Sequence, residues 1–170
     1  MRATSCTGAA SLAFQFDDEL YREIILDHYR NPRNKGDLDP ADVKVNANNP
    51  LCGDEVTITA RISADGQAVE ALHFSGRGCS ISQASASMMT EQVVGRPLPD
   101  ALRIINKFKQ MMLADGGPED LGDLEALQGV KQYPVRIKCA VLPWNSLLQG
   151  LTDRAGETPG PEAHTHSIDG

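Results

Sequence analysis

Two kinds of hydrophobic periodicity, in a fixed order along the chain, most constrain its fold. Apolar and polar residues alternate in three stretches, 43–47, 56–62 and 69–74, and Asp65-Gly66 supplies a turn before the last of them. Alternation of this kind predicts strands with one buried face. From Ser80 onward the apolar spacing becomes helical. Strands followed by helices predict an α+β fold, a small three-stranded antiparallel sheet with helices packed against it.

The helices have recognisable starts and stops. Asp17 or Asp18 is expected to cap a first helix that ends at Asn31-Pro32. Ser80 and Gln83 are suited to a capping box at the start of the next helix, which is expected to end at Gly95. The remaining helical stretches are expected at Leu98–Leu113, Pro118–Gln128 and Cys139–Leu148.

Length and charge narrow the function classes. The 170 residues suit one domain, with a flexible N-terminus at 1–16, a single domain at 17–150 and a mobile C-terminal tail at 151–170. The net charge of -7 argues against nucleic acid as a partner. We expect no membrane partner and a cytoplasmic protein with reduced thiols, because no apolar run spans a bilayer and no secretory signal is recognisable.

Four residues that follow turn signals or open expected helices are suited to one metal site: Cys52, Asp54, Cys79 and Cys139. Gly53 allows a tight turn that aims the sulfur of Cys52 and the carboxylate of Asp54 at one point. Cys79 and Cys139 are each expected at a helix N-terminus, where unpaired backbone N–H groups favour a thiolate. Three sulfurs and one oxygen suit zinc or an iron–sulfur cluster.

Charge and spacing both bear on this interpretation. A divalent ion bound by three thiolates and a carboxylate keeps two negative charges, which Arg136 and Lys138 beside Cys139 are expected to offset. The spacing is not the Cys-x-x-Cys pair of a zinc ribbon, so packed thiols remain an alternative on the residues alone. Cys6 lies in a small-residue N-terminal stretch and is left out of the site.

Four segments in the same order resemble the IscU/NifU N-terminal family of iron–sulfur cluster assembly proteins. They are Leu20–Gly36 (LYREIILDHYRNPRNKG), Asn49–Asp54 (NPLCGD), Gly78–Ser85 (GCSISQAS) and Arg136–Ala140 (RIKCA). The resemblance covers about residues 17–150, and the SufU branch is the most similar. Lys138 stands where classical scaffolds of the family carry a histidine, Gln132–Arg136 replaces their chaperone-recognition segment, and the interval between Cys79 and Cys139 is longer. These departures favour a zinc-dependent sulfur acceptor.

The resemblance implies a SufE/NifU-like fold and makes Cys52, Asp54, Cys79 and Cys139 the metal ligands. It implies a sulfur carrier that takes persulfide sulfur from a SufS-like cysteine desulfurase and passes it to a downstream iron–sulfur scaffold. On this hypothesis Cys52 is the nucleophile, released from zinc when a partner residue takes its place, and Arg136 steadies the developing sulfur anion. The main alternative is a scaffold on which a 2Fe–2S cluster is assembled and transferred. A purely structural zinc module is a third interpretation.

Several other residues are predicted to be structural. His28 and His73 are expected to pack, and Trp144 either packs or shapes a docking surface. His164 and His166 form a pair in the tail that is suited only to adventitious metal. Four methionines are predicted to fill the helical core, namely Met88, Met89, Met111 and Met112.

Overall fold

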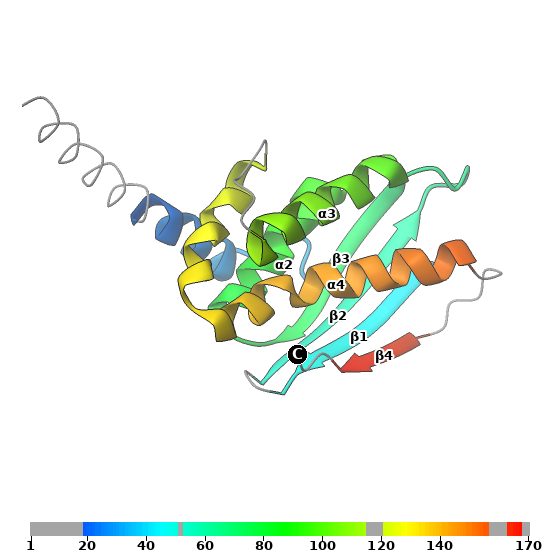
Figure 1. The fold of residues 1–170 in the computed structure, drawn as a ribbon. Coiled ribbons are helices and arrows are strands. Elements are labelled where there is room, and N and C mark those ends of the chain that lie inside the picture. Colours follow the sequence, from blue (N-terminus) through cyan, green and yellow to red (C-terminus); the bar gives the residue numbers. More distant parts are fainter. Residues whose placement is uncertain (1–18, 51–52, 115–120, 157–162, 168–170) are drawn as a thin grey trace, which may run out of the picture.

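A computed structural model describes residues 19–50, 53–114, 121–156 and 163–167, with helices on one side of a sheet (Figure 1). Cys6 and Cys52 lie outside these residues. A first helix spans 19–30, as the sequence predicts. The elements after it are β1 (Val43–Asn49), β2 (Asp54–Ile62), β3 (Val69–Arg77), α2 (Ser80–Val93), α3 (Leu98–Leu113), the 3-10 helix η1 (Gly122–Gln132), α4 (Pro134–Gly156) and β4 (Ala163–Ser167).

The sheet has the strand order β3-β2-β1-β4. β1, β2 and β3 pair antiparallel in sequence order, which confirms the predicted three-stranded sheet. β4 adds a fourth strand parallel to β1, in a part of the chain that the sequence predicts to be a mobile tail. The register pairs Asn49 with Asp54, so the end of β1 and the start of β2 lie side by side at one end of the sheet.

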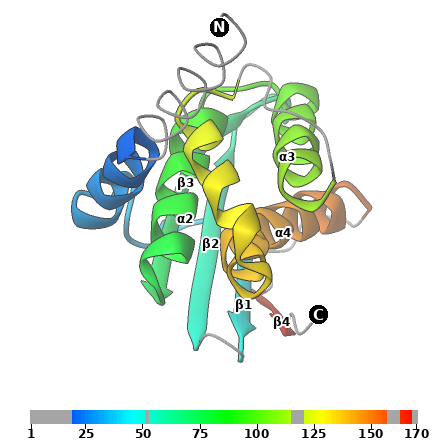
Figure 2. The same ribbon diagram turned by 60° about the vertical axis from the view of Figure 1, so that its left-hand side comes forward.

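One face of the sheet packs against the helices (Figure 2). Val43, Val45 and Ala47 are buried, whereas the residues between them are exposed or half-buried, because side chains of a strand alternate between its two faces. All four methionines predicted for the helical core are at most 1% exposed. The helices therefore hold their positions by burying apolar side chains on the sheet.

A polar link inside the core joins α2 to α4. The Ser85 hydroxyl donates to the Ala140 carbonyl at 2.6 Å and accepts the indole N–H of Trp144 at 2.9 Å. The Trp144 ring is fully buried and stacks on Phe108 of α3, with 4.3 Å between ring centroids. Trp144 thus packs, and the alternative of a docking surface is excluded.

Several predicted helix boundaries are wrong. α4 continues past the predicted end at Leu148 to Gly156, into the first residues of the predicted tail. α4 begins at Pro134, five residues before the predicted start at Cys139, because the extended residue Tyr133 precedes a proline that suits the first helical turn. The short helix predicted at Pro118–Gln128 is the 3-10 helix η1, and residues 115–120 lie outside the described part. Cys79, not Ser80, is the N-cap of α2, and its side chain makes no capping hydrogen bond.

Within the described ranges, none of the helices is both long enough and apolar enough to cross a bilayer.

Candidate metal centre

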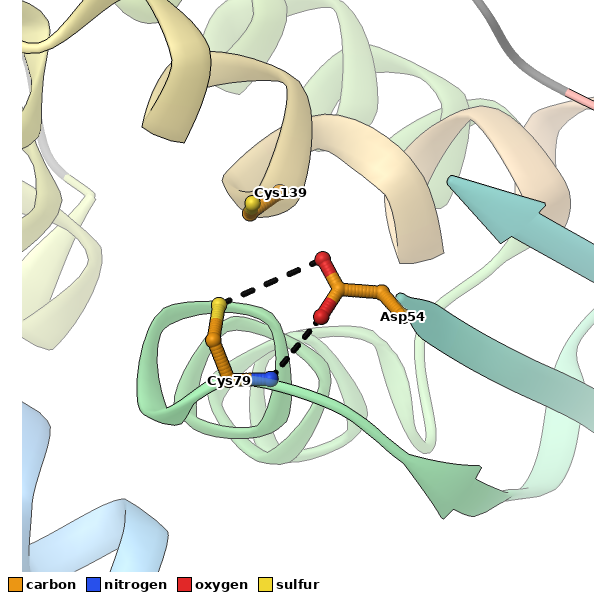
Figure 3. A group of neighbouring side chains, drawn as sticks. All are labelled: Asp54, Cys79 and Cys139. Atoms are coloured by element: carbon orange, nitrogen blue, oxygen red, sulfur yellow. Dashed lines mark hydrogen bonds between the residues drawn. The ribbon is translucent and has the colours of Figure 1, made fainter. Parts of the chain in front are cut away.

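Three of the four predicted ligands converge in space. One donor atom each from Asp54, Cys79 and Cys139 lies within 4.8 Å of the other two (Figure 3). Asp54 is the first residue of β2, Cys79 caps α2 and Cys139 lies in α4. Cys52 is outside the described residues, so its part in the site stays a prediction. Three segments that are far apart in the sequence therefore contribute to one centre.

Asp54 is oriented by the backbone of α2. Its carboxylate is 1% exposed and accepts the backbone N–H of Cys79 at 2.8 Å through Oδ1, while Oδ2 lies 4.0 Å from the sulfur of Cys79. The N–H groups at a helix N-terminus lack intrahelical partners and favour an anion. This contact fixes the carboxylate beside the thiol.

Gly78 makes the contact between Asp54 and Cys79 possible. A Cβ at position 78 would come within 2.5 Å of Asp54 Oδ1 and 2.6 Å of the Ser82 hydroxyl, closer than real Cβ atoms come to their neighbours. Gly53, which precedes Asp54, has a φ of 69°, a left-handed conformation that favours glycine. The turn predicted at Gly53 is therefore confirmed.

Cys79 ionises more readily than an ordinary cysteine. The pKa of Cys79 is lowered from 9.0 to about 6, and a hydrogen bond from the Cys139 side chain is the largest cause. Backbone N–H groups of Ser82 and Ile81 act in the same direction, whereas burial and the charge of Asp54 oppose them. The predicted thiolate at the start of α2 is thus accounted for, but the neighbouring thiol contributes more than the helix terminus.

Cys139 differs from its sequence prediction. Its side chain is fully buried, and its sulfur lies 3.8 Å from the Val135 carbonyl one turn earlier in α4. Because α4 begins at Pro134, Cys139 is in the helix interior and gains nothing from the orphan N–H groups of the first turn. In the absence of metal, its buried side chain favours the thiolate of Cys79.

Arg136 supplies the compensating charge that the sequence predicts. The pKa of Arg136 is raised, first by the negative charge of Cys79 and a hydrogen bond to it, and then by Cys139. The guanidinium side chain is exposed and lies in the first turn of α4. A cation therefore stands at the solvent side of the two sulfurs.

The donor set and its spacing fit a thiophilic metal ion. A tetrahedral zinc ion with a metal–sulfur bond of about 2.3 Å and a metal–oxygen bond of about 2.0 Å separates the sulfur from the oxygen by about 3.5 Å. Cys79 Sγ and Asp54 Oδ2 lie 4.0 Å apart, slightly more than that value. Small side-chain movements would bring the three donors onto one ion, and the lowered pKa of Cys79 favours the thiolate that binds it.

A groove of about 770 Å³ opens beside the centre. Its wall includes Ser80, Arg136 and the exposed side chains of Tyr133 and Val135. Ser80 directly follows Cys79, so the groove reaches the edge of the metal centre.

Sequence reasoning missed the contribution of Ser82. Its hydroxyl donates to the Cys79 carbonyl at 3.2 Å and lies 3.9 Å from the Cys79 sulfur. The signal was a serine three residues after the N-cap, a spacing that places its side chain next to the cap. Ser82 thus helps to fix the backbone that carries Cys79.

Comparison with known proteins identifies the family. The sequence pattern described as the NifU-like N-terminal domain matches residues 20–140. The chain belongs to the NifU-like N-terminal family. It is 49% identical over 141 residues to the zinc-dependent sulfurtransferase SufU of Bacillus subtilis (strain 168), covering 82% of this chain and 94% of that protein.

Two further proteins that this chain resembles are named as scaffolds. The iron-sulfur cluster assembly scaffold protein IscU of Streptococcus pyogenes serotype M1 is 38% identical over 136 residues, which cover 79% of this chain and 84% of that protein. The crystal structure of a putative iron-sulfur cluster assembly scaffold protein for the SUF system from Fervidobacterium islandicum AW-1 superposes with a TM-score of 0.71. That protein is 35% identical, and the match covers 76% of this chain and 94% of that one. The predicted fold and family are therefore confirmed.

Proposed function

We propose that this protein works in iron–sulfur cluster assembly as a zinc-dependent acceptor and carrier of persulfide sulfur. The observation that carries the proposal is the convergence of Asp54, Cys79 and Cys139 on one point, with Arg136 beside the sulfurs. The 49% identity to a protein named zinc-dependent sulfurtransferase supports zinc in preference to a cluster.

The transfer step needs one nucleophilic thiolate, and we assign it to Cys52. The Cys52 thiolate attacks the outer sulfur of a persulfide on a cysteine desulfurase. A new S–S bond forms at Cys52, the old S–S bond breaks, and the desulfurase cysteine leaves as a thiolate. The outer sulfur keeps its proton and no electrons are lost, so the exchange needs no added oxidant or reductant.

The remaining residues hold and orient the centre. Asp54, Cys79 and Cys139 are assigned as ligands of zinc, which when bound keeps the thiols deprotonated and ordered. Arg136 is assigned the stabilisation of the thiolate charge, because both sulfurs raise its pKa. Its exposed position lets it also face the sulfur anion that an incoming protein brings.

The partner is proposed to be a SufS-like cysteine desulfurase that reaches the centre along the adjoining groove. The exposed Tyr133 and Val135 at the groove wall offer apolar contact area beside Arg136. A downstream iron–sulfur scaffold would receive the sulfur.

Cys52→Ala tests the assignment of the nucleophile. We expect the variant to gain no sulfur from the desulfurase, whereas the wild-type protein and a Cys6→Ala control each gain the mass of one sulfur atom per chain. Zinc content is measured in parallel. If the substitution acted only by releasing zinc, another cysteine would still accept sulfur, and its adduct would be detected. Undiminished sulfur acceptance by Cys52→Ala would reject the assigned role.

A second candidate function is a scaffold that builds a 2Fe–2S cluster on the same residues. The thiols of Cys52, Cys79 and Cys139 with the carboxylate of Asp54 would supply the four ligands of that cluster, and the Streptococcus pyogenes relative is named a scaffold. Anaerobic reconstitution separates the two functions. A stable visible chromophore that transfers intact to an apo-ferredoxin supports the scaffold, whereas tightly held zinc that iron does not displace supports sulfur transfer.

A further inference from the structure

A second group of metal-binding side chains lies away from the cysteines. It consists of His28 on the first helix, Glu91 on α2 and Asp123 on η1, and one donor atom of each lies within 4.8 Å of the other two. Three separate segments thus place one imidazole nitrogen and two carboxylates around a common point. Glu91 follows Cys79 by twelve residues along α2, which at 1.5 Å per residue puts the two groups about 18 Å apart.

The imidazole of His28 is buried and held in one orientation. Its ring is 1% exposed, and Nδ1 lies 2.8 Å from the hydroxyl of Ser87. The Ser87 oxygen also accepts the backbone N–H of Arg33 at 2.9 Å. Without an ion, Nε2–H donates to Asp123 Oδ2 at 3.4 Å. A hydroxyl oxygen has two lone pairs, so in the other tautomer Ser87 accepts from Nδ1–H as well, and the Nε2 lone pair is then directed at the carboxylates. Ligating histidines are commonly oriented by a partner at the second nitrogen.

Nε2 of His28 faces two carboxylates at the protein surface. It lies 3.4 Å from Asp123 Oδ2 and 3.6 Å from Glu91 Oε1. The Asp123 and Glu91 side chains are 57% and 45% exposed, so water has access to the point where the three donors meet. The site is buried on the histidine side and open on the carboxylate side.

The local charge balance favours a divalent cation. Arg33 pairs with Asp27 at 2.8 Å and lies 3.8 Å from the second oxygen of Glu91. The guanidinium of Arg33 therefore interacts with three carboxylates, those of Asp27, Glu91 and Asp123. Two negative charges remain when His28 is neutral. A divalent ion between Nε2, Glu91 Oε1 and Asp123 Oδ2 would cancel them, and nitrogen and oxygen donors suit manganese or ferrous iron better than a soft ion.

We propose that His28, Glu91 and Asp123 form a second, exchangeable divalent-cation site, distinct from the cysteine centre. The site has three protein donors and an open side, so water completes its coordination and the ion exchanges readily. A bound ion cross-links the first helix, α2 and η1. The proposal does not depend on the assigned sulfur transfer, because it uses none of the residues of that centre.

Manganese binding to the zinc-loaded full chain tests the proposal. Thiolates are poor ligands for Mn²⁺, and zinc already fills the cysteine centre, so Mn²⁺ reports on the second site. The concentration of unbound Mn²⁺ is measured by electron paramagnetic resonance during a titration, and we expect it to give one bound ion per chain. The titration is done in physiological salt, which screens isolated surface carboxylates. Bound Mn²⁺ is also expected to broaden the NMR signals of the His28 ring.

The key variant is Asp123→Asn, because Asp123 is exposed and its loss leaves the core intact. It should weaken Mn²⁺ binding at least about tenfold, since loss of an outer-shell partner alone costs about 10–100-fold. Glu23→Gln removes the same charge from the exposed face of the first helix and should leave binding unchanged. A His164→Asn/His166→Asn variant should also bind normally, which excludes capture of the ion by the tail histidines.

Three results would overturn the proposal. The first is that the zinc-loaded protein binds no Mn²⁺. The second is that Asp123→Asn and Glu23→Gln weaken Mn²⁺ binding equally. The third is that the tail variant loses Mn²⁺ binding while Asp123→Asn binds Mn²⁺ normally. Failure of sulfur acceptance by the wild-type protein would instead reject the proposed function and leave this site unaffected.

Discussion

The ionisation of Cys79 depends on a neighbouring thiol more than on its place in α2. Cys139 is fully buried in α4 and donates to Cys79, which shares the negative charge between two sulfurs in the absence of metal. The first proton lost therefore comes from the Cys79–Cys139 pair, and its pKa describes the two thiols together. The carboxylate of Asp54 opposes the ionisation and holds the Cys79 backbone at the same time.

We expect Cys79 in the metal-free protein to be alkylated by iodoacetamide with a midpoint near pH 6. The thiolate is the reactive form, so the rate should rise up to the folded-state pKa of about 6 and stay level between pH 7 and pH 9. In unfolded protein the midpoint should move to the ordinary cysteine range of about 8.5. Peptide mass spectrometry after short labelling times measures the rate at Cys79 alone.

Cys139→Ala provides the control for the cause of this shift. It removes the largest hydrogen bond to the Cys79 sulfur and should raise the alkylation midpoint of Cys79 by a measurable margin. A midpoint near pH 9 in the folded, metal-free wild-type protein would contradict the proposed pairing of the two thiols.

At the scale of elements, the relative position of α2 and α4 sets the distance between the two sulfurs. Cys79 caps α2, and Cys139 directly precedes Ala140, whose carbonyl is bound by Ser85 of α2. The same hydroxyl accepts the Trp144 indole N–H. One buried serine thus fixes both helices next to the metal centre.

Ser85→Ala should lower the free energy of unfolding by about 1–3 kcal/mol, because two buried polar groups lose their partner. Ser146→Ala is the matched control, since the Ser146 hydroxyl is also buried but donates only to the Leu142 carbonyl within α4. That change should be nearly neutral. Urea unfolding of both metal-free variants measures the difference, and equal destabilisation would show that the link between α2 and α4 has no special weight.

The sequence predicts those elements whose signals are local. The alternation in β2, the left-handed Gly53 and the N-terminal position of Cys79 all follow from neighbouring residues, and all are confirmed. The start of α4 is not predicted because apolar Val135 and Ile137 alternate with Arg136 and Lys138, a spacing that is not helical. β4 was missed because a short edge strand depends on β1, which is distant in sequence.

The proximity of Cys79 and Cys139 depends likewise on tertiary packing. The sequence groups the two cysteines in one site by residue type and by resemblance to a known family, but no spacing in the chain predicts that a cysteine at a helix start contacts one in a helix interior. The burial of Cys139 and its donation to Cys79 follow from α4 lying against α2, which sequence periodicity does not specify.

At the scale of the whole molecule, the hydrophobic core extends far beyond the candidate metal centre. The buried core covers the sheet and α2, α3 and α4, whereas the candidate ligands lie at the start of β2, the start of α2 and the first part of α4. A protein with a core of this extent does not need a metal ion to fold. Zinc should therefore stabilise the fold without being required for it.

Removal of zinc by a chelator should leave the far-ultraviolet circular dichroism nearly unchanged and the urea transition cooperative. The free energy of unfolding should fall, because an ion that binds only the folded state contributes about 4 kcal/mol at a thousandfold excess over its dissociation constant. Adding zinc back should recover the lost free energy of unfolding in the wild-type protein. Adding zinc back to Asp54→Asn should recover less of it. Unfolding of the wild-type protein on chelation would show that the site is a structural zinc module, with the sheet and helices unable to hold together without the ion.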